Sequence, residues 1–191
     1  MSQMIDDGAP VRSPRKGLRV GPVSELGVFL KVKPGRDEAI REVFQGNAAG
    51  NALEDLIDSL GTLHQARYYL FDNGTRLLIA TTFDGDWDVY IDDFAAVGVL
   101  DAWDTFLIHC EGYPDEGWRA AGLTVEEFKE ILTANQVTAE DFWVDYPGFT
   151  AKEIKKALAL QQSFQQALDN PGAAEALQQP ALKPLLDAAA D

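Results

Sequence analysis

The chain is poor in cysteine, in histidine and in cations. Its 191 residues include one cysteine and two histidines. The lone Cys110 cannot form a disulfide within the chain, so we expect a reducing compartment and a cytoplasmic location. The first twenty residues lack the apolar stretch of a secretory signal. No segment approaches the roughly 18 consecutive apolar residues that a membrane-spanning helix needs.

Positive charge is scarce as well. Sixteen Lys and Arg stand against 31 Asp and Glu, which gives a formal net charge of -15. A surface this acidic repels nucleic acid and anionic membranes, and neither is expected as a partner. Solubility is the simplest explanation of the charge, and a basic partner or a cationic ligand is the alternative.

Composition divides the chain into three parts. Residues 1–22 are rich in Gly, Pro, Ser and basic side chains, which predicts a flexible basic arm. Residues 23–170 carry regular hydrophobic patterns and form the expected folded domain. Residues 171–191 are rich in alanine but interrupted by proline, which predicts a loosely packed tail.

Within the domain, hydrophobic periodicity predicts an alternation of strands and helices. The expected elements are a strand at 26–33, a helix from 36 with a second piece to 60, a hairpin at 65–83, a helix from 87, a helix to about 109, a short helix from 124, a strand at 141–146 and a long helix from 150 to 169. Asn73-Gly74 favours a type I′ hairpin turn. Thr124 with Glu127 forms a capping-box pattern.

This order predicts an α+β fold with the ferredoxin-like β-α-β-β-α-β plan, an antiparallel sheet and additional helices. Helices cover only one face of such a sheet. The hairpin strands are nevertheless apolar on both faces, since Leu77 and Ile79 alternate with Leu78 and Ala80. We therefore expect a second copy of the chain to cover the other face, as a homodimer.

Two runs carry a resemblance to a known superfamily. FLKVKPGRDEAIREVF is similar to the first strand and helix of dimeric α/β-barrel proteins of the antibiotic-biosynthesis-monooxygenase type. LHQARYYLFDNGTRLLIATTFDGDWDVYIDDF resembles a hairpin and helix of the same superfamily, including peroxidase-related bacterial proteins. The resemblance covers roughly residues 24–168. It implies a dimeric α/β barrel that encloses a small-molecule chamber, but it implies no single activity.

The candidate catalytic residues are His64 and Arg67, at the start of the hairpin. If they converge on the chamber, His64 would act as a base and Arg67 would stabilise negative charge. The alternative is a partly buried structural histidine and an arginine paired with a nearby aspartate. The expected substrate-binding residues are aromatic: Phe29, Tyr69, Phe71, Trp87 and Tyr90.

Metal ligation is not expected. Asp84, Asp86 and Asp88 have calcium-loop spacing, but Val89 and Ala95 replace the required Gly and Glu, so helix capping is the better interpretation. His109 and Cys110 are adjacent, and their side chains diverge, which argues against a Cys–His nucleophile.

No cofactor is expected, with haem as the alternative. The motif Gly-x-x-Asp-Gly of dye-decolourising peroxidases is matched only by Asp84 and Gly85, because Thr81 replaces the first glycine. No histidine follows His109, which leaves His64 or His109 as axial ligands. Three functions stay open: a small-molecule-binding barrel with cofactor-free monooxygenase-like activity on an aromatic or apolar substrate, a non-catalytic interaction or ligand-sensing module, and a haem-dependent peroxidase-like enzyme.

Overall fold

The computed structural model describes residues 11–13, 16–47 and 52–189, and it has an α+β fold. The strands are β1 (Val11–Ser13), β2 (Gly17–Val20), β3 (Val23–Lys31), β4 (Leu63–Phe71) and β5 (Arg76–Asp84). The α-helices are α1 (Asp37–Asn47), α2 (Ala52–Leu60), α3 (Trp87–Val97), α4 (Val99–Leu107), α5 (Val125–Asn135), α6 (Ala151–Leu168), α7 (Ala174–Leu177) and α8 (Lys183–Ala189). The chain divides into two compact units, Met1–Ala151 and Lys152–Asp191.

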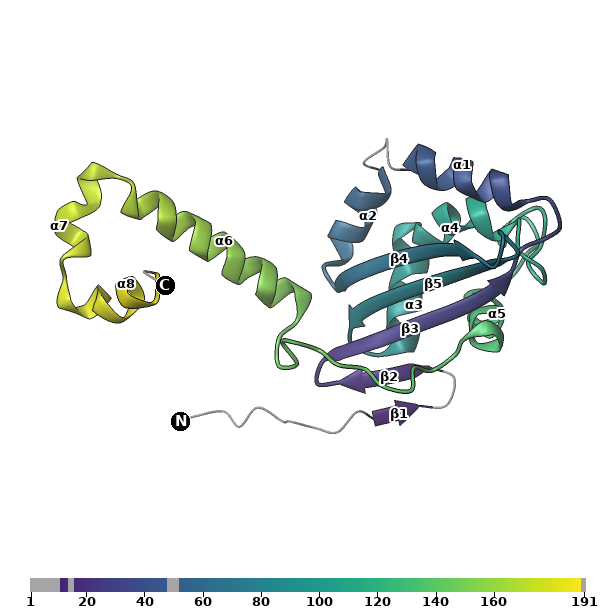
Figure 1. Cartoon of the computed structure of the whole chain (residues 1–191), viewed down its shortest axis with the longest axis horizontal. Helices are drawn as coiled ribbons and strands as arrows, with labels where there is room; N and C mark the ends of the chain where they lie inside the picture. The colour runs from purple at the N-terminus through teal and green to yellow at the C-terminus, as the bar shows by residue number, and fades with distance from the viewer. Residues whose placement is uncertain (1–10, 14–15, 48–51, 190–191) are drawn as a thin grey trace. The chain divides into compact units, whose positions relative to one another are not determined.

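The five strands form one antiparallel sheet in the order β1-β2-β3-β5-β4. Its centre is the long β3–β5 pair, which runs from Val23 opposite Asp84 to Lys31 opposite Arg76. Figure 1 shows α3 and α4 behind this sheet, so the face toward the viewer is the one without helices. We call it the open face.

The alternation of side chains explains why helices pack on one face only. In β3, Leu26, Val28 and Leu30 are almost fully buried and belong to the core. Successive strand residues point to opposite faces, so their neighbours must point to the open face. Aromatic side chains of α3 and α4 fill the other half of the core, with Phe94 packed edge-on against Trp103.

Local signals place the helix ends. Asp86 caps α3 by accepting the N–H of Asp88 at 2.9 Å, and Gly98 ends that helix in the left-handed conformation. The predicted capping box is confirmed, because Thr124 and Glu127 exchange side-chain bonds with each other's backbone N–H at the start of α5.

The predicted hairpin is also confirmed, but its turn is longer than expected. The last strand pair is Phe71 with Arg76, so four residues make the loop instead of two. Asp72, Asn73 and Gly74 all have positive φ angles. A Cβ on Gly74 would lie 2.8 Å from the Asp37 side chain, so the approach of α1 to the turn requires glycine there.

The complete ferredoxin-like order is wrong. The first three predicted strands do adopt the central arrangement β3-β5-β4, but residues 141–146 form no strand. β2 instead occupies the edge of β3, through the pairs Arg19–Ser24 and Val20–Val23. A two-residue turn joins β2 to β3, so this pairing costs far less loop-closure entropy than pairing with a segment more than a hundred residues away.

The N-terminal part is therefore more ordered than a flexible arm. Residues 11–13 and 17–20 are strands β1 and β2, and Leu18 is buried. The remaining part of the expected arm, residues 1–10 and 14–15, lies outside the described residues.

The second unit is helical. α6 ends at Leu168, and Asn170 then accepts the N–H of Gly172 and opens a short 3-10 turn. No residue of Pro171–Ala189 is buried. Among the described residues, no helix combines the length and the apolar character needed to cross a membrane.

Candidate ligand-binding site on the open face

Aromatic side chains project from the open face of the sheet. Phe29, Tyr69 and Phe71 are 37%, 47% and 37% exposed, on β3 and β4. Phe29 packs edge-on against Phe71, with ring centroids 6.4 Å apart. Three of the expected substrate-binding residues thus lie on the face without helices. An exposed aromatic group of this kind is unusual for a surface in contact with water alone.

The segment after α5 covers part of the open face. It runs back along β3: Gln136 bridges Val28, the Val137 N–H donates to the Gly27 carbonyl at 2.9 Å, and the Ala139 N–H donates to Glu25. We call residues 137–142, which form neither helix nor strand, the covering segment. A cavity of about 380 Å³ lies between this segment and the strands, and we call it the covered cavity. Its lining from the strands includes Phe29, Arg67, Leu78 and Ala80, and its lining from the segment includes Val137 and Phe142.

Glu25 anchors the covering segment. Its side chain is 8% exposed, and its Oε1 accepts the N–H groups of Leu18 at 3.0 Å and Ala139 at 3.1 Å. A buried carboxylate needs such donors, since an unsatisfied buried charge is costly. Gly27 permits the close approach, because a Cβ there would lie only 3.2 Å from the Val137 carbonyl oxygen. Glu25 therefore connects β2, β3 and the roof of the covered cavity.

Arg67 is the cation of the covered cavity. It lines the cavity from β4 and is exposed. Among the residues that the structure describes, its guanidinium has no hydrogen-bond or ion-pair partner. The alternative that Arg67 pairs with a nearby aspartate is therefore not seen in this part of the chain. An unpaired guanidinium beside apolar side chains is suited to a polar or acidic group on a ligand.

His64 has a different environment. A bulge between Leu63 and Gln65 displaces it from regular alternation. Its Nε2 lies 2.8 Å from Oδ1 of Asp84, and the other oxygen of that carboxylate accepts the N–H of Ala151 at 2.7 Å. His64 is not among the residues that line the covered cavity. The structure thus does not bring His64 and Arg67 together around one cavity.

Trp87 and Tyr90 lie on the helix side of the sheet, not on the open face. Both belong to the core and are 3% and 2% exposed. Tyr90 stacks on Phe83 with centroids 3.7 Å apart, and burial raises the pKa of its hydroxyl. The Trp87 Nε1–H donates to Oε1 of Gln136 at 2.9 Å. Packing and this hydrogen bond account for Trp87, and stacking on Phe83 accounts for the Tyr90 ring.

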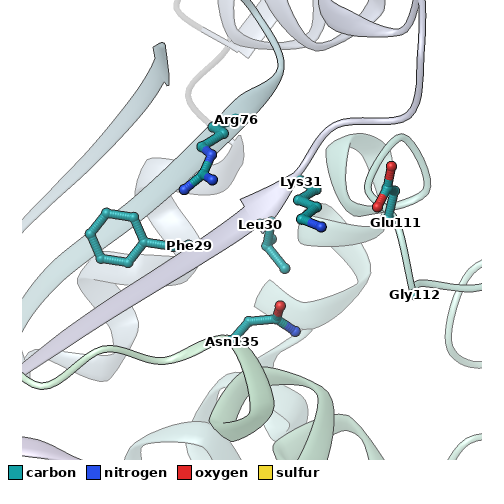
Figure 2. A pocket seen from close by; sticks show the side chains of 7 residues that line it. All are labelled: Phe29, Leu30, Lys31, Arg76, Glu111, Gly112 and Asn135. Carbon is teal, nitrogen blue, oxygen red and sulfur yellow. The ribbon is translucent and has the colours of Figure 1, made fainter. Parts of the chain in front are cut away.

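A second cavity lies on the far side of Phe29, which lines both. Its volume is about 370 Å³, and we call it the cationic cavity because two cations line it, Lys31 and Arg76. Figure 2 shows the Arg76 guanidinium directed toward the space between Phe29 and Lys31. The other lining residues are Leu30, Glu111, Gly112 and Asn135.

The aspartates with calcium-loop spacing have separate partners. Asp84 binds His64 and Ala151, Asp86 caps α3, and Asp88 pairs with Lys16. Each carboxylate thus stabilises a different piece of local structure. The capping role expected for this sequence is confirmed at Asp86.

Cys110 is a core residue. It is fully buried, its Sγ faces the Phe106 carbonyl at 3.8 Å, and burial raises the pKa of its thiol to about 12. The thiolate, which is the nucleophilic form, is scarce at neutral pH under these conditions. The neighbouring His109 has a lowered pKa, because of burial and because of the positive charges of Arg36 and Lys33.

In comparisons with known proteins, no protein-family model matches this chain, and no curated protein and no solved structure matches it either.

The periodicity of the strands located the aromatic part of the site but missed three features. The strand predicted at 141–146 overlaps only the end of the covering segment, and the periodicity predicts neither a role for Glu25 nor a pairing of Lys31 with Arg76. A signal for Glu25 exists in the sequence, since one acid interrupts the long apolar run of β3. The Lys31–Arg76 pair could not be anticipated without the register of two strands that are distant along the chain.

Proposed function

We propose that this protein binds a small apolar or aromatic molecule in the covered cavity. The observation that carries the proposal is the cavity of about 380 Å³ between the open face and residues 137–142, lined by Phe29, Leu78 and Phe142 with Arg67 beside them. Sites for small molecules commonly have this size and combine an apolar lining with few polar groups. Arg67 would orient the ligand through its polar or acidic group.

The geometry supports binding better than catalysis by His64. The Asp84 carboxylate binds the His64 ring and the Ala151 N–H, and both contacts hold parts of the fold together. His64 lies outside the lining of the covered cavity. A monooxygenase-like reaction would need its base within hydrogen-bond reach of the substrate. We therefore propose a binding or sensing protein as the leading function, with the cofactor-free oxidoreductase as the alternative.

A second copy of the chain is a further candidate for the part of the open face that stays uncovered. Tyr69 and Phe71 are exposed and line neither of the two cavities described above. Two open faces in contact would remove these aromatic rings from water. Sedimentation equilibrium with wild-type protein and with Tyr69→Ser/Phe71→Ser tests this: a dimer that the variant loses supports the homodimer, and a wild-type monomer contradicts it.

Binding in the covered cavity is tested with N-phenylnaphthylamine, a neutral aromatic probe whose fluorescence rises in apolar surroundings. Ala80→Trp places a large ring inside the cavity, because Ala80 lines it. The matched control is Ala96→Trp, the same change at an exposed position of α3. We expect Ala80→Trp to raise the Kd at least about tenfold and the control to leave it within about twofold. Absence of binding to wild type, or equal binding by both variants, would contradict the proposal.

A further inference from the structure

Three cations of this acidic protein share the open face. Lys31 lies on β3, Arg67 on β4 and Arg76 on β5. The two buried or half-buried acids near the same face are already satisfied, since Glu25 accepts two backbone N–H groups and Asp84 binds His64 and Ala151. Three cations thus gather on one face of a chain whose net charge is -15, and the acids Glu25 and Glu140 line the covered cavity beside Arg67.

Lys31 and Arg76 stand directly opposite each other on neighbouring strands. Side chains in this relation are about 5 Å apart at Cβ, and like charges there destabilise a sheet. Neither cation is well neutralised. Arg76 has only a 3.7 Å contact with the exposed Asp72, and the Lys31 ammonium has no hydrogen-bond or ion-pair partner among the described residues. A bound anion between them would remove the repulsion.

One carboxylate, Glu111, also lines the cationic cavity. With two cations and one acid, the lining carries a single net positive charge, which matches a monoanion better than a phosphate dianion. The amide of Asn135 lies at the same cavity, with its Nδ2 donating to the Ile131 carbonyl at 2.8 Å and its Oδ1 left for other contacts. The pKa of His109 is lowered by burial first and then by the charges of Arg36 and Lys33, and this second cause agrees with a positive potential at this end of the sheet.

Phe29 connects this cavity to the proposed binding site, because its side chain lines both the cationic cavity and the covered cavity. We propose that the ligand is an elongated apolar monoanion: its acid group, such as a carboxylate, lies between Lys31 and Arg76, and its apolar body crosses Phe29 into the covered cavity. This inference rests on the proposed function and adds the charge of the ligand and the place of its acid group.

Two probes with the same aromatic body test the inference. N-phenylnaphthylamine is neutral, and anilinonaphthalene sulfonate carries one added sulfonate. We expect wild type to prefer the sulfonate by at least about tenfold in Kd at low salt. We expect Lys31→Met/Arg76→Met to bind both probes with similar Kd values, while the Kd of the neutral probe stays near that of wild type. The preference should also weaken as salt is added.

The control is Arg41→Gln, which removes one exposed cation from α1, and it should keep the wild-type preference. If circular dichroism shows that the double variant does not fold, the single variants Lys31→Met and Arg76→Met replace it. Each single variant should lose part of the preference for the sulfonate probe. A wild type that binds both probes equally, or a preference that survives in the Lys31 and Arg76 variants, overturns the inference and leaves the proposed function intact. A wild type that binds neither probe overturns both.

Discussion

The imidazole Nε2 of His64 lies 2.8 Å from Oδ1 of Asp84, and this contact is linked to the backbone of a distant segment. The second oxygen of Asp84 accepts the N–H of Ala151 at 2.7 Å. One carboxylate therefore joins the start of β4, the end of β5 and the first residue of α6. Because the side chains of His64 and Asp84 are only 17% and 9% exposed, these bonds are shielded from water.

Replacing Asp84 by Ala should destabilise the first unit. The change leaves the His64 ring and the Ala151 N–H without their acceptor, and we expect a loss of about 1–3 kcal/mol in the free energy of unfolding, measured by urea denaturation.

His64→Ala should leave the Kd of N-phenylnaphthylamine within about twofold of wild type, since His64 lies outside the covered cavity. Lost probe binding with unchanged stability would instead assign His64 to the ligand site.

Replacing Glu25 by Ala should weaken both the fold and the covered cavity. The N–H groups of Leu18 and Ala139 lose a charged acceptor, which costs about 1.5–3 kcal/mol in the free energy of unfolding. The covering segment also loses an anchor, so the Kd of the neutral probe should rise. Glu25→Gln keeps an acceptor oxygen and should cost less in both measurements. Unchanged urea midpoints in both variants would show that Glu25 does not hold the segment.

Removing one member of the Lys31–Arg76 pair should stabilise the ligand-free protein. Lys31→Thr removes a like-charge contact across the strands and adds a residue that favours strands, so the free energy of unfolding should rise by about 0.2–1 kcal/mol. The gain should shrink in high salt, which screens the repulsion. Arg41→Gln, on α1, should show no comparable gain. A salt-independent loss of stability in Lys31→Thr would mean that the Lys31 stem contributes packing rather than repulsion.

The charge state of His109 should make stability depend on pH. Burial and the charges of Arg36 and Lys33 hold its pKa below the ordinary 6.5, so the folded state binds the proton less readily than the unfolded state does. The contribution of His109 to stability is complete above pH 6.5 and is lost as the pH falls from 6.5 through the folded-state pKa. The stability difference between wild type and His109→Gln should follow this course.

The cause of that lowered pKa can be measured directly. In an NMR titration of the imidazole protons, the midpoint of His109 should lie below 6.5 and should move upward in Arg36→Gln. Arg41→Gln should leave the midpoint unchanged. A midpoint at or above 6.5 in wild type would contradict the pH dependence and the positive potential at this end of the sheet.

Local patterns were enough to predict most elements of the fold. The alternation in β3 and in the hairpin, the helical spacing of α3 and the capping box of α5 all depend on residues close together in the chain, and all are confirmed. The same alternation placed Phe29, Tyr69 and Phe71 on the face without helices. These features follow from backbone geometry and burial, which repeat every two residues in a strand and every 3.6 in a helix.

Long-range pairing decided the rest. Either β2 or residues 141–146 could pair with the edge of β3. β2 pairs there because a short turn connects it to β3, whereas residues 141–146 are distant along the chain, and no local pattern carries that information. The roof over the covered cavity and the opposition of Lys31 and Arg76 are likewise consequences of register between remote segments. The aromatic chemistry of the site is thus readable from the sequence, whereas its enclosure and its charge arise only when the chain folds.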